Sequence, residues 1–319
     1  MRAATRRGSR LLGVGGYRPR RAVANAELCA RIDSTPDWIE SRSGIVSRGF
    51  ADADETLEVM AAAAGTRALA AAGLAPGDVD CLLVATTSDR VQVPQLSARV
   101  ARELGLPRAG GFDVLAACAG FCHGIGVAGD LVALGSADHV LVVGVERMTD
   151  IVGPDDRTTA FLFADGAGAA VVGPSPTPGI GPTVRGIDIA STAALGMTDE
   201  PTPVLSMDGR RVFRWAVEEG VPACRRALDA AGVDVDDLAA FVPHQANLRI
   251  VDVLATRLAL PARVVVARDV VDTGNTSAAS VPLALARLLA DGAVPSGAPA
   301  LLFGFGAGLN YAGQVVLLP

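Results

Sequence analysis

Cys118 stands at a junction that favours nucleophilic chemistry. The apolar run 111–115 predicts a strand and the small-residue segment 119–134 predicts a helix, so the thiol lies at the helix start. The partial positive charge of a helix N-terminus favours a thiolate, and its N–H groups can receive an oxyanion. Gly120 permits close approach of a substrate. Most single cysteines are buried structural residues, which is our interpretation of three others: Cys29, Cys81 and Cys224.

Two polar residues in the second half of the chain could complete a site around Cys118. His244 directly follows the apolar run 240–242, at a strand end, where α/β folds place their sites. Asn275 lies in the turn 272–277, which corresponds to the Cys118 turn if the two halves are duplicates. Duplication would then bring Cys118 and Asn275 to facing positions, with His244 beside them.

A metal site is the other chemistry that this neighbourhood suggests. Cys118, Cys122 and His123 are close in sequence, but a second ligand pair is missing. On a helix, His123 also lies about 100° round from Cys122. The spacing differs from the Cys-x-x-Cys-His pattern that attaches haem. We therefore expect no metal ion.

The elements that must position these residues recur in two series. Apolar runs that alternate with helical patterns predict mostly buried sheets, and two tandem series predict an α/β fold of two pseudo-symmetric halves. We expect an N-terminal half over 1–173, a connecting or substrate-facing loop over 174–207, and a C-terminal half over 208–319. The predicted strands are 81–86, 111–115, 139–145, 169–172, 240–242, 263–267, 300–303 and 314–318; the predicted helices are 57–72, 94–106, 119–134, 212–231, 247–258 and 277–289.

Composition limits the possible partners. Half of the 319 residues are apolar and 19% are charged, which is enough for a large buried core. The net charge of −6 argues against nucleic acid as the default partner. Apolar stretches are too short to span a membrane, and the basic start 1–7 lacks a signal-peptide core, so we expect a cytoplasmic protein. An odd number of cysteines, five, does not indicate a disulfide framework.

Three segments carry a resemblance to a known family. The chain resembles the β-ketoacyl-acyl-carrier-protein synthase III family from about Leu12 to Leu318, and its motifs occur in the family's order. The matching segments are Asp113 to Phe121 around the cysteine, Val242 to Ile250 around the histidine, Gly274 to Ser280 around the asparagine, and the glycine-rich Gly304 to Leu309. This resemblance implies a thiolase-like fold layered α-β-α-β-α, and membership among synthases that prime fatty-acid or aromatic-polyketide assembly.

The resemblance also implies a reaction. Cys118 would take an acyl group from acyl-CoA, and malonyl-acyl-carrier protein would then enter. His244 and Asn275 would promote loss of CO₂, and the carbanion would attack the acyl group to give 3-oxoacyl-carrier protein. The N–H groups of Cys118 and Ala307 would form the oxyanion hole. The resemblance implies no cofactor beyond the thioester substrates. It also implies a homodimer.

Substrate-binding residues follow from the same resemblance. Trp38 would stack on the adenine of CoA and Arg157 would close its other face. The phosphates and the pantetheine tunnel would be lined by Arg42, Gly209, Phe213, Ala246 and Asn247. A basic rim for the acidic carrier protein would comprise Arg210, Arg211, Arg214, Arg249 and Arg257.

The acyl pocket departs from the family pattern. Val93 stands where many members carry a bulky Phe that reaches the partner subunit's acyl pocket. A smaller residue there suggests a short starter larger than acetyl. The other residues expected to shape this pocket are Met148, Phe163 and Leu205.

Other functions remain open on the sequence alone. An acyltransferase of the same fold would need Cys118 and His244 but not Asn275, which favours condensation. Synthases of the hydroxymethylglutaryl-CoA or chalcone type fit the cysteine and histidine segments less well. A cysteine hydrolase lacks the expected local sequence, and a non-catalytic binding role would leave three intact catalytic segments unexplained.

Overall fold

Two five-stranded sheets of the same design form the frame of the protein. The computed structural model describes residues 7–198 and 203–319. The first sheet has the order β1 (Gly8–Tyr17), β7 (Asp165–Ser175), β6 (Val140–Arg147), β4 (Cys81–Ala85) and β5 (Gly110–Val114). The second has the order β8 (Val184–Ile187), β14 (Asn310–Leu317), β13 (Pro299–Gly306), β11 (Ala240–Pro243) and β12 (Val265–Val266). In each sheet the first two pairings are antiparallel and the last two parallel, so the halves are pseudo-symmetric.

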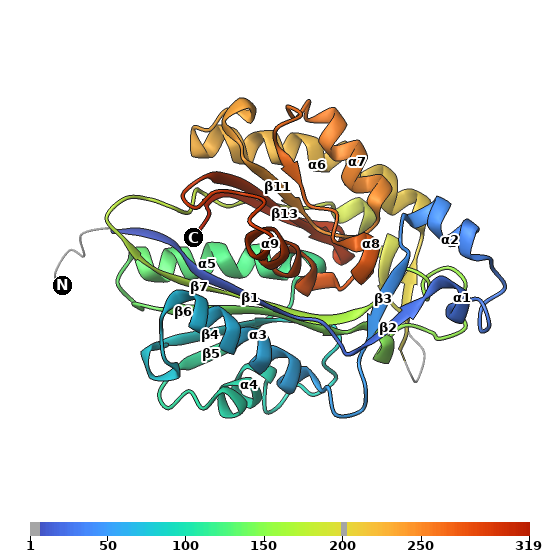
Figure 1. The fold of residues 1–319 in the computed structure, drawn as a ribbon, viewed down its shortest axis with the longest axis horizontal. Coiled ribbons are helices and arrows are strands. Elements are labelled where there is room, and N and C mark those ends of the chain that lie inside the picture. The colour runs from blue at the N-terminus through green and yellow to red at the C-terminus, as the bar shows by residue number, and fades with distance from the viewer. Residues whose placement is uncertain (1–6, 199–202) are drawn as a thin grey trace.

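Helices cover both faces of each sheet. Figure 1 shows α5 (Gly120–Ala133) and α9 (Ser280–Ala290) between the sheets, with α3 (Leu57–Ala72) and α4 (Leu96–Leu104) on one outer face. On the other outer face lie α6 (Gly209–Ala231) and α7 (Leu248–Arg257). The layered α-β-α-β-α arrangement predicted from the sequence is confirmed.

Shorter helices and strands lie outside these layers. They are β2 (Arg21–Ala24), α1 (Asn25–Leu28), α2 (Pro36–Ser43), β3 (Ser47–Phe50), β9 (Leu195–Met197), β10 (Leu205–Met207) and α8 (Val270–Thr273). Apolar side chains fill each space between layers: Phe303 and Leu254 under α6 and α7, Ile125 and Leu285 between the sheets, Met60 and Leu141 under α3.

The sequence prediction failed at two equivalent strands. Neither β1 nor β8 was predicted, although each is the first strand of its half. In β1, Gly13 and Gly15 interrupt the apolar pattern because helix α3 packs against the strand backbone; a Cβ on either would lie 2.5 Å or less from α3 backbone atoms. Strand β8 lies in the proline- and glycine-rich segment that we expected to be a loop.

The segment 174–207 is therefore more structured than expected. Within its described part it contains the end of β7 and the strands β8, β9 and β10, and β8 belongs to the second sheet. Residues 199–202 of this segment and residues 1–6 of the basic start lie outside the described residues. The domain boundaries at 173 and 207 stay a prediction.

Two glycines let each half touch the turn of the other. A Cβ on Gly144 of β6 would lie 2.3 Å from the carbonyl oxygen of Ala278, at the start of the α9 turn. A Cβ on Gly304 of β13 would lie 2.9 Å from Cα of Ala119, in the Cys118 turn. By these contacts the two glycines are equivalent, and the two turns cross-pack through bare backbone.

Among the residues that the structure describes, no helix has the length and apolarity needed to cross a membrane.

Gly144→Ala is expected to destabilise the fold, because the new methyl group would clash with the backbone of the Ala278 turn. We expect a loss of about 1–3 kcal/mol in the free energy of unfolding, measured by urea denaturation. Gly77→Ala is the matched control, since a Cβ there meets nothing within 4 Å. Equal stability of the two variants would contradict the cross-packing.

Candidate active site

Cys118 lies in a short 3-10 turn, Ala117–Ala119, between β5 and α5. The turn is tight, with Ala117 at φ 45°. Strand β13 ends against it, so that a Cβ on Gly306 would lie 2.8 Å from Sγ of Cys118. The sulfur is buried under this strand but still lines a cavity of about 1080 Å³. Cys118 thus lies between a strand and the start of a helix, where the sequence placed it.

The same cavity brings the other two predicted residues to Cys118. His244 follows the end of β11, Asn275 precedes the 3-10 turn Ser277–Ala279, and all three side chains line the cavity. The pairing of turns that duplication predicted therefore occurs. The three residues come from segments more than 30 residues apart, and only the crossed packing of the halves unites them.

His244 is a neutral imidazole held by the second half. Its backbone N–H donates to the carbonyl of Phe303 at 2.7 Å, and Nδ1 lies 2.6 Å from Oγ of Ser280. Burial lowers the pKa of His244 to about 3, so the ring is uncharged near neutral pH. A hydroxyl can donate or accept, so Ser280 is compatible with either tautomer. Nε2 can therefore act as a base in one step and as a donor in another.

Asn275 presents an amide donor. Its Oδ1 accepts the N–H of Ser277 at 2.9 Å, which fixes the orientation of the side chain. The backbone is held as well, because its N–H donates to Leu162 and its carbonyl accepts from Ala164. With Oδ1 engaged, Nδ2 is the group that Asn275 can offer to a ligand carbonyl.

The state of the Cys118 thiol differs from our expectation. We expected the helix start to favour a thiolate, but burial raises the pKa of the Cys118 thiol to about 12. Hydrogen bonds from the backbone N–H groups of Cys118 and Ala307 oppose this rise, and the Glu146 carboxylate adds to it. A hydrogen bond from the Ser277 hydroxyl to the sulfur would also oppose the rise, but that hydroxyl donates to Glu146 at 2.8 Å. The resting residue is therefore a thiol. The two opposing N–H groups are those predicted for the oxyanion hole.

Trp38 lies at the cavity mouth and carries arginines on its ring. Thr35 caps α2 by accepting the Trp38 N–H, which places the indole at the cavity. The guanidinium carbons of Arg157 and Arg42 lie 5.0 Å and 5.8 Å from the centroid of its ring. Phe161 contacts the ring edge-on at 5.2 Å. This arrangement gives an aromatic face with adjacent positive charge, as a nucleotide would require.

The remaining predicted CoA residues also line the cavity: Gly209, Phe213, Ala246 and Asn247. Asn247 has a structural task in addition. Its Oδ1 accepts the N–H of Arg249 at the start of α7, and its Nδ2 donates to the carbonyl of Arg42. It thereby ties α7 to the end of α2. The role of these residues in CoA binding stays a prediction.

The predicted acyl-pocket residues do not all meet. Phe163 lines the cavity, whereas Met148 and Leu205 are buried in the same apolar core behind it. Val93 is 86% exposed and does not line the cavity at Cys118. The sequence prediction missed Leu195, Met207 and Phe305, which line the cavity. Phe305 could have been found, since it stands between the two glycines of the Gly304–Gly306 motif.

Four of the five predicted rim arginines line the cavity mouth: Arg210, Arg214, Arg249 and Arg257. Arg211 does not. Its guanidinium donates to the carbonyl of Ala190 at 2.8 Å and to Oγ of Ser191 at 3.0 Å, on the side of α6 turned to the preceding segment. Arg211 thus lies apart from the other four, because the period of α6 directs adjacent residues to different faces, and the part of all five in carrier binding stays a prediction.

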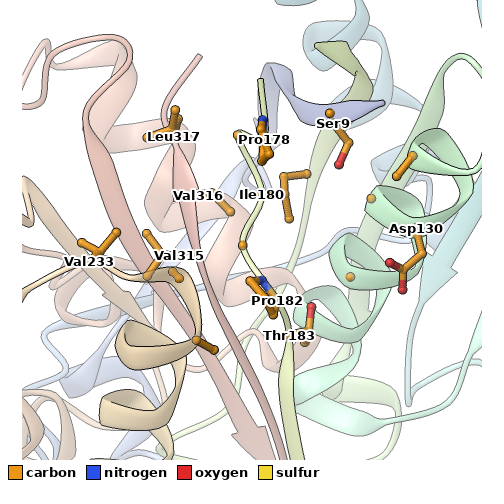
Figure 2. A pocket seen from close by; sticks show the side chains of 18 of the residues that line it. Ser9, Asp130, Pro178, Ile180, Pro182, Thr183, Val233, Val315, Val316 and Leu317 are labelled. Carbon is orange, nitrogen blue, oxygen red and sulfur yellow. The ribbon is translucent and has the colours of Figure 1, made fainter. Parts of the chain in front are cut away.

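A second cavity, of about 740 Å³, is separate from these residues. Figure 2 shows Asp130 of α5 on one side and Val315 to Leu317 of β14 on the other, with Ile180 and Pro182 between them. Its walls include no cysteine or histidine. The cavity at Cys118 is therefore the candidate active site.

Comparisons with known proteins agree with this geometry. The family model 3-oxoacyl-[acyl-carrier-protein] synthase III matches residues 112–188, and the model of its C-terminal part matches 228–318. The chain is 58% identical to the β-ketoacyl-[acyl-carrier-protein] synthase III of Streptomyces lividans, over 100% of this chain and 97% of that protein. It is 49% identical to the mycobacterial synthase III of Mycobacterium avium, over 97% of this chain and 95% of that one.

Solved structures give the same result. The priming β-ketosynthase of the R1128 polyketide pathway superposes with a TM-score of 0.98 at 58% identity, over 100% of this chain and 98% of that one. The 3-oxoacyl-[acyl-carrier-protein] synthase III of Aquifex aeolicus gives a TM-score of 0.92 at 34% identity, over 97% and 100%. The segments that place Cys118, His244 and Asn275 around one cavity thus belong to a shared architecture, and the chain is a member of the β-ketoacyl-acyl-carrier-protein synthase III family.

Proposed function

We propose that the protein joins an acyl group from acyl-CoA to malonyl-acyl-carrier protein by decarboxylative Claisen condensation. The observation that carries the proposal is the convergence of a thiol, a neutral imidazole and an amide donor on one cavity. The product is a 3-oxoacyl-carrier protein, and the reaction primes fatty-acid or polyketide assembly. No cofactor is required beyond the thioester substrates.

The first half-reaction loads Cys118. Because the thiol is protonated at rest, Nε2 of neutral His244 accepts its proton as Sγ attacks the thioester carbonyl. The N–H groups of Cys118 and Ala307 receive the oxyanion. When the intermediate collapses, CoA leaves and takes the proton from the histidine, and the acyl group stays on sulfur.

The second half-reaction forms the carbon–carbon bond. After loading, the neutral ring of His244 moves its proton from Nδ1 to Nε2 by exchange with solvent, a change of tautomer that Ser280 permits. The malonyl thioester carbonyl then sits against Nε2–H of His244 and Nδ2 of Asn275, which stabilise negative charge on its oxygen as CO₂ departs. The resulting carbanion attacks the acyl-Cys118 carbonyl. Sulfur leaves as a thiolate, and a proton from solvent restores the thiol.

We also propose that a second copy of the chain completes the acyl pocket. Strand β5 is the edge of its sheet, and beside it Val93 and Leu115 are 86% and 84% exposed. Exposed apolar residues next to an unpaired strand edge suit pairing with an identical strand. Val93 would then reach the partner's cavity and, being small, admit a short starter larger than acetyl.

Loss of the amide donor should separate the two half-reactions. Asn275→Ala is expected to lower the condensation rate by about 10²–10³-fold, because one donor to the enolate oxygen is lost. Loading of Cys118 from acyl-CoA should continue. Mass spectrometry of the carrier protein and of the Cys118 peptide measures both. Unchanged condensation in this variant would contradict the role given to Asn275. A wild-type enzyme that loads Cys118 but neither decarboxylates nor condenses would instead support an acyltransferase.

The size of residue 93 should set the starter preference. We expect turnover with butyryl-CoA to match or exceed that with acetyl-CoA, and Val93→Phe to lower the butyryl-to-acetyl ratio of kcat/KM about tenfold or more. Val91→Phe is the control, since Val91 is exposed in the same segment.

Light scattering measures the oligomeric state, on which the shared acyl pocket depends. A strict acetyl-CoA preference would contradict the starter assignment, and a monomer would contradict the shared pocket.

The basic rim should act on the carrier protein alone. Arg257→Glu is expected to raise KM for malonyl-carrier protein, because the rim attracts an acidic partner. The increase should reach about tenfold at low salt and be smaller at higher salt, where surface charges are screened. KM for malonyl-pantetheine should not change. Arg102→Glu alters net charge equally but lies on α4, on the opposite outer face. Equal effects of both substitutions would remove the rim from carrier recognition.

A further inference from the structure

Glu146 is a buried carboxylate that the reaction above does not use. It lies at the end of β6 and is fully buried. Its Oε2 accepts hydrogen bonds from the hydroxyls of Thr86 and Ser88 and from the N–H groups of Thr87 and Ser88. All of these donors belong to the segment that follows β4.

The other carboxylate oxygen faces the opposite half of the protein. Oε1 accepts the Ser277 hydroxyl at 2.8 Å and the N–H of Ala278 at 3.4 Å, both in the 3-10 turn before α9. Thr87 N–H is shared by both oxygens. Backbone N–H groups can only donate, so this environment suits the ionised acid. Burial raises the pKa of Glu146, and these hydrogen bonds oppose the rise.

Ser277 connects Glu146 to the nucleophile. Its hydroxyl is within hydrogen-bonding reach of both Oε1 of Glu146 and Sγ of Cys118. A serine hydroxyl has one proton, so the carboxylate and the sulfur compete for it. A carboxylate is a strong acceptor. With Glu146 ionised, the proton goes to the acid and is withheld from the sulfur.

The charge of Glu146 acts on the sulfur directly as well. Burial is the main cause of the raised pKa of Cys118, and the Glu146 carboxylate adds to it. Two other titratable groups lie near the sulfur: His244, which follows β11, and Cys122, one turn along α5. His244 is neutral, and burial raises the pKa of Cys122 to about 12. Glu146 is therefore the charged group among those that face Cys118.

We propose that Glu146 is a positioning residue that holds the Ser277 hydroxyl away from Cys118 and keeps the nucleophile a thiol until His244 removes its proton. In the acyl-enzyme the sulfur carries neither a proton nor a charge, so the effect of Glu146 applies before loading and again when the sulfur leaves as a thiolate. The unloaded enzyme thereby resists oxidation and adventitious alkylation, which attack the thiolate.

The test is the pH profile of Cys118 alkylation by iodoacetamide, with the modified peptide identified by mass spectrometry. Glu146→Gln removes the charge at constant size. We expect its profile to move to lower pH, with alkylation at neutral pH about tenfold faster than in the wild type, which corresponds to one pKa unit. The reagent reads the thiol itself, so the result does not depend on which thioester the enzyme accepts.

Asp165→Asn is the matched control. Asp165 is a second buried carboxylate, at the start of β7, bonded to Ala51 and Thr149 and not to the Cys118 turn. Its profile should follow the wild type. A Glu146→Gln profile that overlays the wild type, or an equal shift in Asp165→Asn, would overturn the proposal.

Ser277→Ala gives an independent measurement if Glu146→Gln does not fold. The proposal expects alkylation within about twofold of the wild type, because the Ser277 proton is already committed to Glu146. Alkylation slowed about tenfold would show that Ser277 normally donates to the sulfur, and the proposal would be wrong.

Discussion

The active site depends on the close approach of each half's central strand to the turn of the other half. Gly144 and Gly304 leave no room for a side chain where β6 meets the Ala278 turn and β13 meets the Cys118 turn. Because both contacts are backbone to backbone, the relative position of the halves is fixed with little freedom to slide. No single half contains all three of Cys118, His244 and Asn275, so their mutual geometry depends on this contact.

In the resulting cavity, the groups that react are uncharged before the substrate binds. Cys118 is a thiol and His244 a neutral imidazole, both because burial disfavours their charged forms. The N–H groups of Cys118 and Ala307 and the amide of Asn275 are oriented dipoles. Such dipoles stabilise negative charge when it develops on a substrate oxygen and require no rearrangement at that moment. Positive charge is kept at the mouth, on Arg157, Arg249 and their neighbours.

Sequence reasoning succeeded where a residue's role follows from its local segment. The position of Cys118 before α5, the strand-end position of His244 and the pairing of the two turns could all be predicted. The thiol state of Cys118 could not, because its burial is created by β13 from the other half. Glu146 was missed since an acid at the end of an apolar run resembles a solvated residue. Strand β1 was missed because Gly13 and Gly15, which make room for helix α3, interrupt its apolar pattern. Strand β8 was missed because it lies in a proline- and glycine-rich segment without clear periodicity.

The duplication has one more consequence, which concerns the number of working centres. Glu146 follows Gly144 by two residues, as Gly306 follows Gly304, so the carboxylate stands where the other half leaves space beside Cys118. There it takes the hydroxyl of Ser277 and the N–H of Ala278, the donors of the equivalent turn. The space beside Cys118 is thus open to the oxyanion of a substrate. The equivalent space in the other half is filled by the Glu146 carboxylate, which is covalently part of the chain. In the part of the chain that the structure describes, the second of the two equivalent positions is therefore filled by the protein itself and is closed to a substrate.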